Sequence, residues 1–241
     1  MSDNVPWNAD DLVFDETRFK GVVRLFPLPD LIMFPHVMQP LHIFEPRYRA
    51  LLNEALDSDG LIAMCMLAPG WEDNYEGRPR VLPYACLGKV VTHQRTEKGE
   101  YNILLLGMRR IHIDRELPPT RLFRQAEVTL LDDFCTTDND INRPALQAAL
   151  TKQFQDFLPH GKSIDAALQE LLATEIPLGV LTDLVSFALP MNFNEKRDLL
   201  GECDIDKRAT MLLTALDSAS PGNSSRGSRR MFRTLPPFSS N

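Results

Sequence analysis

Histidine and carboxylate side chains occur together in the first half of the sequence, and such pairs bind metal ions when their spacing is suitable. His42 and Glu45 are three residues apart, a spacing that places two side chains on one face of a helix. No second pair of this kind follows, and Glu45 directly precedes Pro46, where a helix is expected to begin. A carboxylate at that position stabilises the positive end of the helix dipole. The sequence therefore predicts no metal site and no cofactor.

Nucleophilic catalysis and nucleotide binding also require particular patterns. A phosphate-binding loop has the form G-x-x-x-x-G-K-[ST] or G-x-G-x-x-G, and a hydrolase elbow has the form G-x-S-x-G. None of these occurs in the sequence. The cysteines lie far apart without a C-x-x-C pair, which indicates reduced, buried thiols and not zinc ligands, disulfides or nucleophiles. They are Cys65, Cys86, Cys135 and Cys203. We therefore expect no enzymatic activity.

Aromatic and methionine side chains give a better functional signal. Trp71 and Tyr75 lie in a polar loop, where exposed aromatic residues often mark a binding surface. The alternative is that these two rings pack back on the domain. Met33, Phe34 and Met38 would add the adaptable apolar surface that promiscuous binding proteins use. We take these five residues as candidates for binding a peptide or a protein partner.

The elements that position these side chains begin in residues 25–48, an apolar stretch interrupted by prolines. Because proline lacks an N–H and has a fixed φ, the stretch predicts short extended pieces joined by corners. The prolines are Pro27, Pro29, Pro35, Pro40 and Pro46. Apolar periodicity then predicts one helix over 46–58, and strands over 61–67, 85–94, 101–108, 110–117 and 124–131. Six or seven short strands with one inserted helix are typical of a small, partly open barrel.

The second half of the sequence has helical periodicity. Composition changes over 132–143, and beyond it five apolar stripes with short connections predict a compact helical bundle. The stripes lie at 146–157, after Ser163, from Pro177, from Asn192 with Glu195 as a capping box, and from Asp204.

The stretch LFPLPDLIMFPHVMQPLHIFEPRYRALL, which begins at Leu25, resembles the opening of the Lon N-terminal substrate-binding domain. That domain also occurs as a free-standing bacterial protein and inside cereblon. The likeness continues through CLG at 86–88, YNILLLG at 101–107 and the arginines at 109–110, and it covers roughly residues 22–217. It implies an α+β fold, in which a PUA-like β pseudo-barrel with one inserted helix precedes an all-α bundle of about five helices.

Several residues in the shared motifs are assigned structural roles. We expect Glu45 to act near the helix N-terminus, and Arg47 to tie that helix to the opening corner. The full set is Pro27, Pro35, Pro40, Glu45, Pro46, Arg47, Tyr48, Gly88, Gly107 and Arg110.

The resemblance implies a non-catalytic module that binds unfolded or extended polypeptide segments or a protein partner. Lon proteases carry an ATPase module and a Ser–Lys protease dyad after this domain, and we expect neither in this chain. A label such as ATP-dependent protease La or peptidase S16 would therefore describe the family. The alternatives are RNA binding, because PUA-like barrels include RNA-modification modules, and a hydrolase with an unrecognised site.

Charge and composition limit the partners. The 241 residues carry a net charge of −7, which gives no general attraction to nucleic acid or anionic lipid. We find no secretory signal and no apolar run near the roughly 20 residues that span a bilayer, so a cytoplasmic protein without membrane contact is expected.

Four parts are expected along the chain. An arm at 1–21 is followed by the barrel at 22–132, the helical bundle at 133–217 and a flexible basic tail at 218–241. The arm either frays in solvent or, as its apolar residues at 12–14 favour, docks on its own domain or on a second copy in a homodimer.

Overall fold

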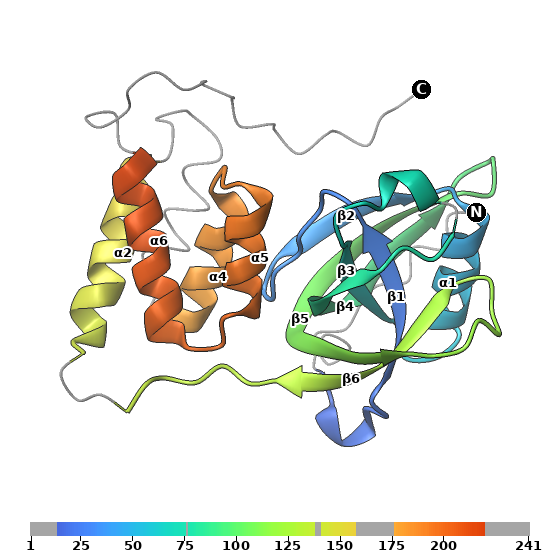
Figure 1. Cartoon of the computed structure of the whole chain (residues 1–241), viewed down its shortest axis with the longest axis horizontal. Coiled ribbons are helices and arrows are strands. Elements are labelled where there is room, and N and C mark those ends of the chain that lie inside the picture. The colour runs from blue at the N-terminus through green and yellow to red at the C-terminus, as the bar shows by residue number, and fades with distance from the viewer. Residues whose placement is uncertain (1–13, 76, 138–140, 158–175, 220–241) are drawn as a thin grey trace. The chain divides into compact units, whose positions relative to one another are not determined.

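The chain forms two compact units, which divide between Asp132 and Asp133. The computed structural model describes residues 14–75, 77–137, 141–157 and 176–219 (Figure 1). Within these ranges the first unit holds six β-strands and one α-helix, and the second holds four α-helices. The helix expected after Ser163, most of the N-terminal arm and nearly all of the basic tail lie outside the described residues.

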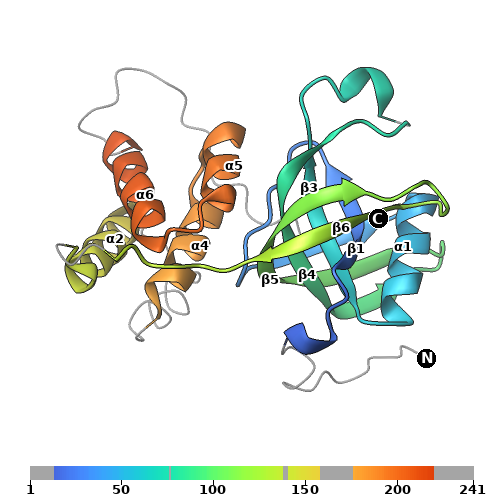
Figure 2. The same cartoon turned by 60° about the horizontal axis from the view of Figure 1, so that its bottom comes forward.

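The six strands of the first unit build a closed five-stranded barrel and one additional strand. They are β1 Val22–Leu28, β2 Met38–Ile43, β3 Leu61–Leu67, β4 Val81–Arg95, β5 Tyr101–Glu116 and β6 Arg124–Leu131. Their order is β2-β5-β4-β3-β1-β6, and a further pairing between β5 and β6 closes five of them into a ring (Figure 2). Strand β2 is the additional strand, attached to β5. The predicted α+β fold with a β-barrel is confirmed.

Strand β5 differs from the sequence prediction, which divided it into strands at 101–108 and 110–117. It is one strand of 16 residues, because β4 pairs with it along both halves. On its other edge the partner changes: β2 pairs with residues 101–106, and β6 pairs with residues 110–116. The break seen in the sequence thus corresponds to this change of partner.

Alternate strand residues point into the barrel and form its core, as period-2 patterning requires. Examples are Leu25, Ala63, Leu87, Ile111 and Ala126. Strand β3 is buried on both faces, because helix α1 (Pro46–Leu56) packs on β1 and β3.

Helix α1 begins at Pro46 as its sequence predicts, and it ends at Leu56, two residues before the predicted end. Pro46 occupies the first helical turn, where its missing N–H costs nothing. At the other end, Gly60 adopts a φ of +69°, and its N–H donates to the carbonyl oxygen of Ala55 at 2.8 Å. The buried ring of Tyr48 stacks on Phe26, with 4.0 Å between ring centroids, and its hydroxyl donates to the carbonyl oxygen of Pro27.

The chain preceding β2 crosses β5 at Gly107. A Cβ atom at this position would lie 2.1 Å from the carbonyl oxygen of Phe34, far inside van der Waals contact. The N–H of His36 donates to the carbonyl oxygen of Gly107 at 2.8 Å, and the N–H of Gly107 donates to that of Val37 at 2.9 Å. The two backbones are therefore held together where β5 changes partner, and only glycine leaves room for this contact.

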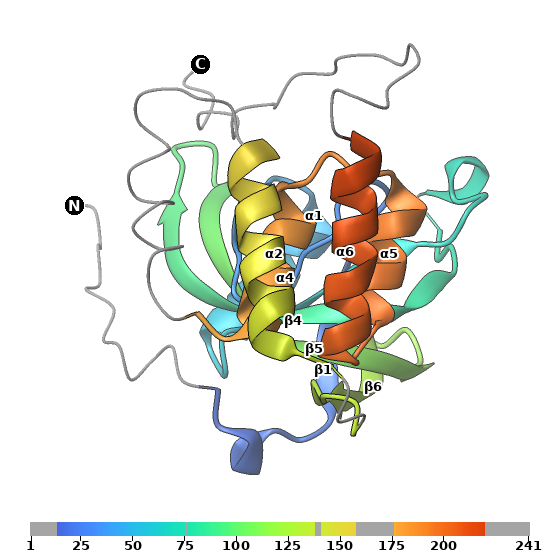
Figure 3. The ribbon, with the colours of Figure 1, turned by 90° about the vertical axis from the view of Figure 1, so that its left-hand side faces the viewer.

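The second unit contains helices α2 Arg143–Phe157, α4 Leu178–Ala188, α5 Phe193–Gly201 and α6 Ile205–Ala219. Figure 3 shows α2 and α6 running side by side, and α4 packs against each of the other three. The helix starts predicted from the capping residues Asn192 and Asp204 are confirmed, whereas the one predicted at Ser163 lies outside the described residues. Asn192 and Glu195 form a capping box, and Asp204 Oδ1 accepts the N–H of Asp206 at 3.0 Å. None of the helices in the described ranges is both long and apolar enough to cross a membrane.

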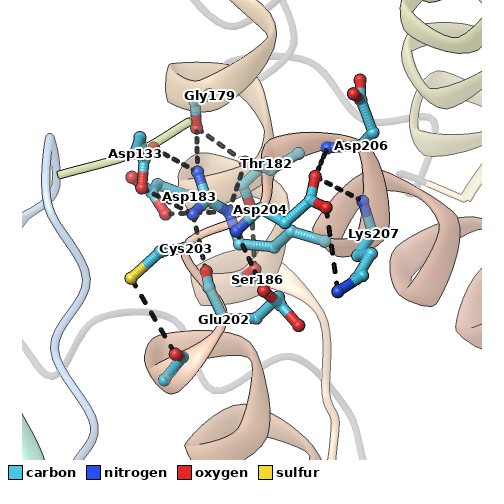
Figure 4. Close-up of polar contacts among 12 residues, drawn as sticks. Asp133, Gly179, Thr182, Asp183, Ser186, Glu202, Cys203, Asp204, Asp206 and Lys207 are labelled. Carbon is cyan, nitrogen blue, oxygen red and sulfur yellow. Dashed lines mark hydrogen bonds and ion pairs between the residues drawn. The ribbon is translucent and has the colours of Figure 1, made fainter. Parts of the chain in front are cut away.

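Arg208 on α6 is completely buried and organises the helical unit. Its guanidinium donates to both carboxylate oxygens of Asp133, to the Thr182 hydroxyl at 2.8 Å, and to the carbonyl oxygens of Glu202 at 2.9 Å and Gly179 at 3.4 Å. Figure 4 shows Asp133, Gly179 and Thr182 gathered in this network. Because a buried charge needs its partners, these contacts fix α4, α6 and the segment after Asp132 relative to one another.

That segment is also joined to the start of α6 through its backbone. The N–H of Phe134 donates to the carbonyl oxygen of Cys203 at 3.0 Å, and the N–H of Ile205 donates to that of Phe134 at 2.9 Å. Nearby, Arg143 forms an ion pair with the buried Asp206 at 2.9 Å. Residues 133–137 thus belong structurally to the helices that follow them.

We predict that Gly107→Ala lowers the free energy of unfolding by about 3 kcal/mol, since the added methyl group meets rigid backbone. Gly70→Ala is the control: no atom lies within 4 Å of its added Cβ, and a φ of +86° should cost only about 1 kcal/mol. Urea unfolding monitored by circular dichroism measures both. Equal losses in the two variants would contradict the close crossing.

We predict that Arg208→Met lowers the free energy of unfolding of the helical unit by about 3–5 kcal/mol, because the partner carboxylate of Asp133 loses its counter-ion. Arg197→Met removes a solvent-exposed ion pair with Asp198 and should cost less than about 0.5 kcal/mol. Thermal unfolding followed by far-UV circular dichroism distinguishes the two. A small effect of Arg208→Met would show that the network contributes little.

Candidate functional site

In the described part of the helical unit, the buried hydroxyls of Thr182 and Ser186 have structural partners. The Thr182 hydroxyl donates to the carbonyl oxygen of Gly179, and the Ser186 hydroxyl donates to that of Thr182, both at 2.7 Å. A nucleophilic hydroxyl instead needs a hydrogen bond to a base. Burial lowers the pKa of Lys196 to about 8, yet its ammonium donates to the carbonyl oxygen of Phe187 at 2.8 Å.

The cysteines and histidines likewise have ordinary environments. All four cysteines are free; Cys65 and Cys86 are buried as expected, but Cys135 is exposed because it lies in the extended segment between the units' regular elements. Burial raises the pKa of Cys65 to about 12, so this thiol keeps its proton. Within the described ranges no three metal-binding side chains gather. His42 pairs instead with Asn102 at 2.8 Å and Glu100 at 3.3 Å.

A pocket of about 170 Å³ opens at one end of the barrel and is the strongest candidate for a binding site. Its walls come from β1, the start of α1, Tyr75 and residues 77–79, and residues 119–124, which lead into β6. The lining side chains are mostly apolar, aromatic or arginine. They include Leu25, Pro27, Tyr48, Leu67, Tyr75, Pro79, Pro119, Leu122 and Phe123, together with Arg47, Arg78, Arg121 and Arg124.

Arg47 and Tyr75 form one wall of the pocket through contacts with Glu45. Arg47 Nη2 lies 2.7 Å from Glu45 Oε2, and the Tyr75 hydroxyl donates to Glu45 Oε1 at 3.1 Å. The guanidinium lies over the rings of both Tyr48 and Tyr75, 4.8 Å from each centroid. Burial, and then the nearby Glu45 carboxylate, raise the pKa of Tyr75, so its hydroxyl stays protonated and can donate.

These contacts change the roles expected for Glu45 and Arg47. Glu45 is the N-cap residue of α1, but its side chain makes no capping hydrogen bond, because the carboxylate is already paired with Arg47 and Tyr75. The contacts of Arg47 join α1 to the loop that carries Tyr75, and not to the opening corner as the sequence suggested.

The other wall is built by arginines that sequence inspection missed. Arg124 is bound through Nε and Nη2 to Glu116, from which Arg78 is 3.9 Å away. Arg121 pairs with Glu54 and lies near the ring of Phe123. The only sequence signal was the cluster RLFR at 121–124, and arginines from separate segments converge here only when the barrel closes.

The candidate binding residues fall into three groups. Trp71 and Tyr75 are half-buried, contact each other edge to face at 5.6 Å between centroids, and lie at or beside the pocket. Met38 is 46% exposed on β2, away from the pocket lining. The prediction that Met33 and Phe34 contribute to a binding surface is wrong, because they are buried beneath the crossing of β5, with exposures of 1% and 0%.

The remaining motif residues lie at positions where strand pairing or close packing restricts the residue type. Pro27 lies in the half of β1 that pairs only with β3, and Pro40 lies on the edge strand β2, so neither interrupts a central ladder. A Cβ atom at Gly88 would lie 2.7 Å from the side chain of Leu105. Pro35 is buried beside the crossing at Gly107, and Arg110 is 3% exposed in β5.

Comparison with known proteins identifies a family whose model matches this chain and several similar proteins. The family model described as the ATP-dependent protease La (LON) substrate-binding domain matches residues 22–218. A Lon protease 2 of Desulfotalea psychrophila is 27% identical over 197 residues, which are 81% of this chain and 25% of that protein. A Lon protease of Dictyoglomus thermophilum is 23% identical over 78% of this chain and 23% of its own length. The chain thus spans about a quarter of the length of these relatives.

Solved structures show the same fold. The N-terminal domain of a Mycobacterium avium complex Lon protease matches with a TM-score of 0.64 and 19% identity, covering 81% of this chain and 98% of that one. A Lon N-terminal domain protein from Xanthomonas campestris matches with a TM-score of 0.58 and 18% identity, covering 80% and 97%.

Proposed function

The chain belongs to the family of LON substrate-binding domains, and from this premise we propose that it is a non-catalytic module that binds unfolded or extended polypeptide segments. Proteolysis is the activity named for its much longer relatives, and we do not extend it to this chain.

The observation that carries this proposal is the combination of apolar, aromatic and arginine side chains in the pocket and beside it. Loop residues supply aromatic rings, and Leu122 beside them is 75% exposed. Unfolded segments differ from folded surfaces in offering apolar side chains that are not already buried. Aromatic and arginine side chains bind such segments well, because they combine large apolar area with hydrogen-bonding groups.

The loop geometry supports a binding role for Trp71 and Tyr75. The Glu45 hydrogen bond and the Arg47 contact hold the Tyr75 ring in place, and Trp71 rests against that ring. A ring fixed before binding loses little further freedom when a ligand arrives. Met38 on β2 offers a second, separate apolar position, and a second copy of the chain stays a candidate partner.

We predict that Trp71→Ala and Tyr75→Ala each weaken binding of a fluorescently labelled unfolded polypeptide about tenfold, as truncation of aromatic anchors commonly does. Fluorescence anisotropy measures the dissociation constants, with bound peptides first selected on an array. Tyr75→Phe keeps the ring and should retain most of the affinity. Phe134→Ala, which removes a 53% exposed ring from the helical unit, is the matched control and should bind like the unaltered chain. Unchanged binding by both alanine variants would remove this loop from the proposed site.

A further inference from the structure

The pocket at the end of the barrel carries a local positive charge, although the chain as a whole is acidic. Among the described residues, four arginines line it, and no aspartate or glutamate does. The carboxylates that pair with these arginines are Glu45, Glu54 and Glu116, none of which is among the described lining residues. Within the described residues these four cations have three carboxylate partners, one of which, Glu54, is shared with Arg24, and this balance favours an anion in the pocket.

Arg124 has an unused hydrogen-bond donor. Its side chain is only 10% exposed, and Glu116 occupies Nε and Nη2. Nη1 is buried and has no hydrogen-bond partner in the described part of the chain. Arg47 Nη1 makes only a long contact of 3.5 Å, to the carbonyl oxygen of Tyr75. Because a buried charged donor without a partner is costly, an oxyanion that accepts from these groups would be stabilised.

The volume and the lining of the pocket limit the size and the chemistry of the group that carries the anion. A volume of about 170 Å³ is well below the roughly 300–1,000 Å³ of sites that enclose drug-sized ligands. Leucine, proline and aromatic side chains form much of the wall, so a small apolar group fits beside the charge. A nucleotide is too large, and inorganic phosphate would leave the apolar wall uncovered.

We propose that this pocket binds the free carboxylate end of a polypeptide whose last residue is apolar. The two oxygens of a carboxylate could accept charge-assisted hydrogen bonds from Nη1 of Arg124 and Nη1 of Arg47, and the last apolar side chain would contact Leu122 and Phe123. The inference rests on the proposed polypeptide binding and names the part of the ligand that this pocket selects. Chain ends are accessible in unfolded polypeptides, so the two proposals describe one ligand.

The test uses minimal probes and the whole chain. N-acetyl-leucine and N-acetyl-leucinamide differ only in the terminal charge, and calorimetry or NMR titration measures their affinities at one salt concentration. The acid should bind about tenfold more tightly than the amide, the effect expected for losing a charge-assisted hydrogen bond. Equal affinity of the two probes, or no binding of either, would overturn the inference.

Two further probes separate other anions from a chain end. The α-amide of N-acetyl-aspartate carries a side-chain carboxylate without a free terminus, and inorganic phosphate carries charge without an apolar group. If either binds as tightly as N-acetyl-leucine, the pocket is a general anion site and the terminal-carboxylate proposal fails. Weaker binding of both supports it.

Variants of the pocket arginines test whether the probes bind in this pocket. Arg78→Gln and Arg121→Gln change partly exposed side chains, so the barrel should still fold, and each should reduce the preference for the acid roughly two- to fivefold. Arg115→Gln removes an exposed arginine of β5 outside the pocket and is the matched control. An undiminished preference in both pocket variants would refute the assignment.

The outcome distinguishes this inference from the broader proposal. Binding of unfolded polypeptide that is equal for free-acid and amidated peptides would leave the proposed function intact and reject the terminal-carboxylate pocket. Binding of N-acetyl-leucine in the pocket, without binding of longer polypeptides, would support the pocket and reject the broader function.

Discussion

The barrel depends on the close contact between the backbone at Phe34 and Gly107. Strand β5 must leave β2 and join β6 within a few residues, and the chain that leads into β2 passes over it at this change. Two backbone hydrogen bonds satisfy the polar groups at the crossing, so the strand continues without an unpaired gap. Closure of the ring, burial of Met33 and Phe34, and placement of the additional strand all follow from this contact.

Closure of the barrel also creates the pocket. Arg124 begins β6 and pairs in register with Leu25 of β1, while residues 119–123 approach the start of α1. Side chains from separate parts of the sequence therefore surround one small volume. Their carboxylate partners hold the arginines in position, and none of these carboxylates is among the described residues that line the pocket.

The sequence revealed the local structure of this chain better than its site. Proline spacing, the buried run at 61–67 and the caps at Asn192 and Asp204 act through near neighbours, so they predicted elements that the structure contains. The single strand β5 and the burial of Phe34 depend on pairing between distant segments, which periodicity does not encode. Arg78, Arg121 and Arg124 were missed for the same reason: each one looks like an ordinary solvated charge until the chain is closed.

The buried Arg208 limits where the chain can be divided to express the helical unit alone. Its counter-ion, Asp133, comes from the stretch just after the barrel's last strand, and Phe134 is hydrogen bonded to residues on both sides of Asp204. That stretch looks like a connector in the sequence, yet it is an integral piece of the helical fold. An expression fragment of the helices should therefore start no later than Asp133, whereas one started at Arg143 would lose both the carboxylate of Asp133 that pairs with Arg208 and the backbone hydrogen bonds of Phe134.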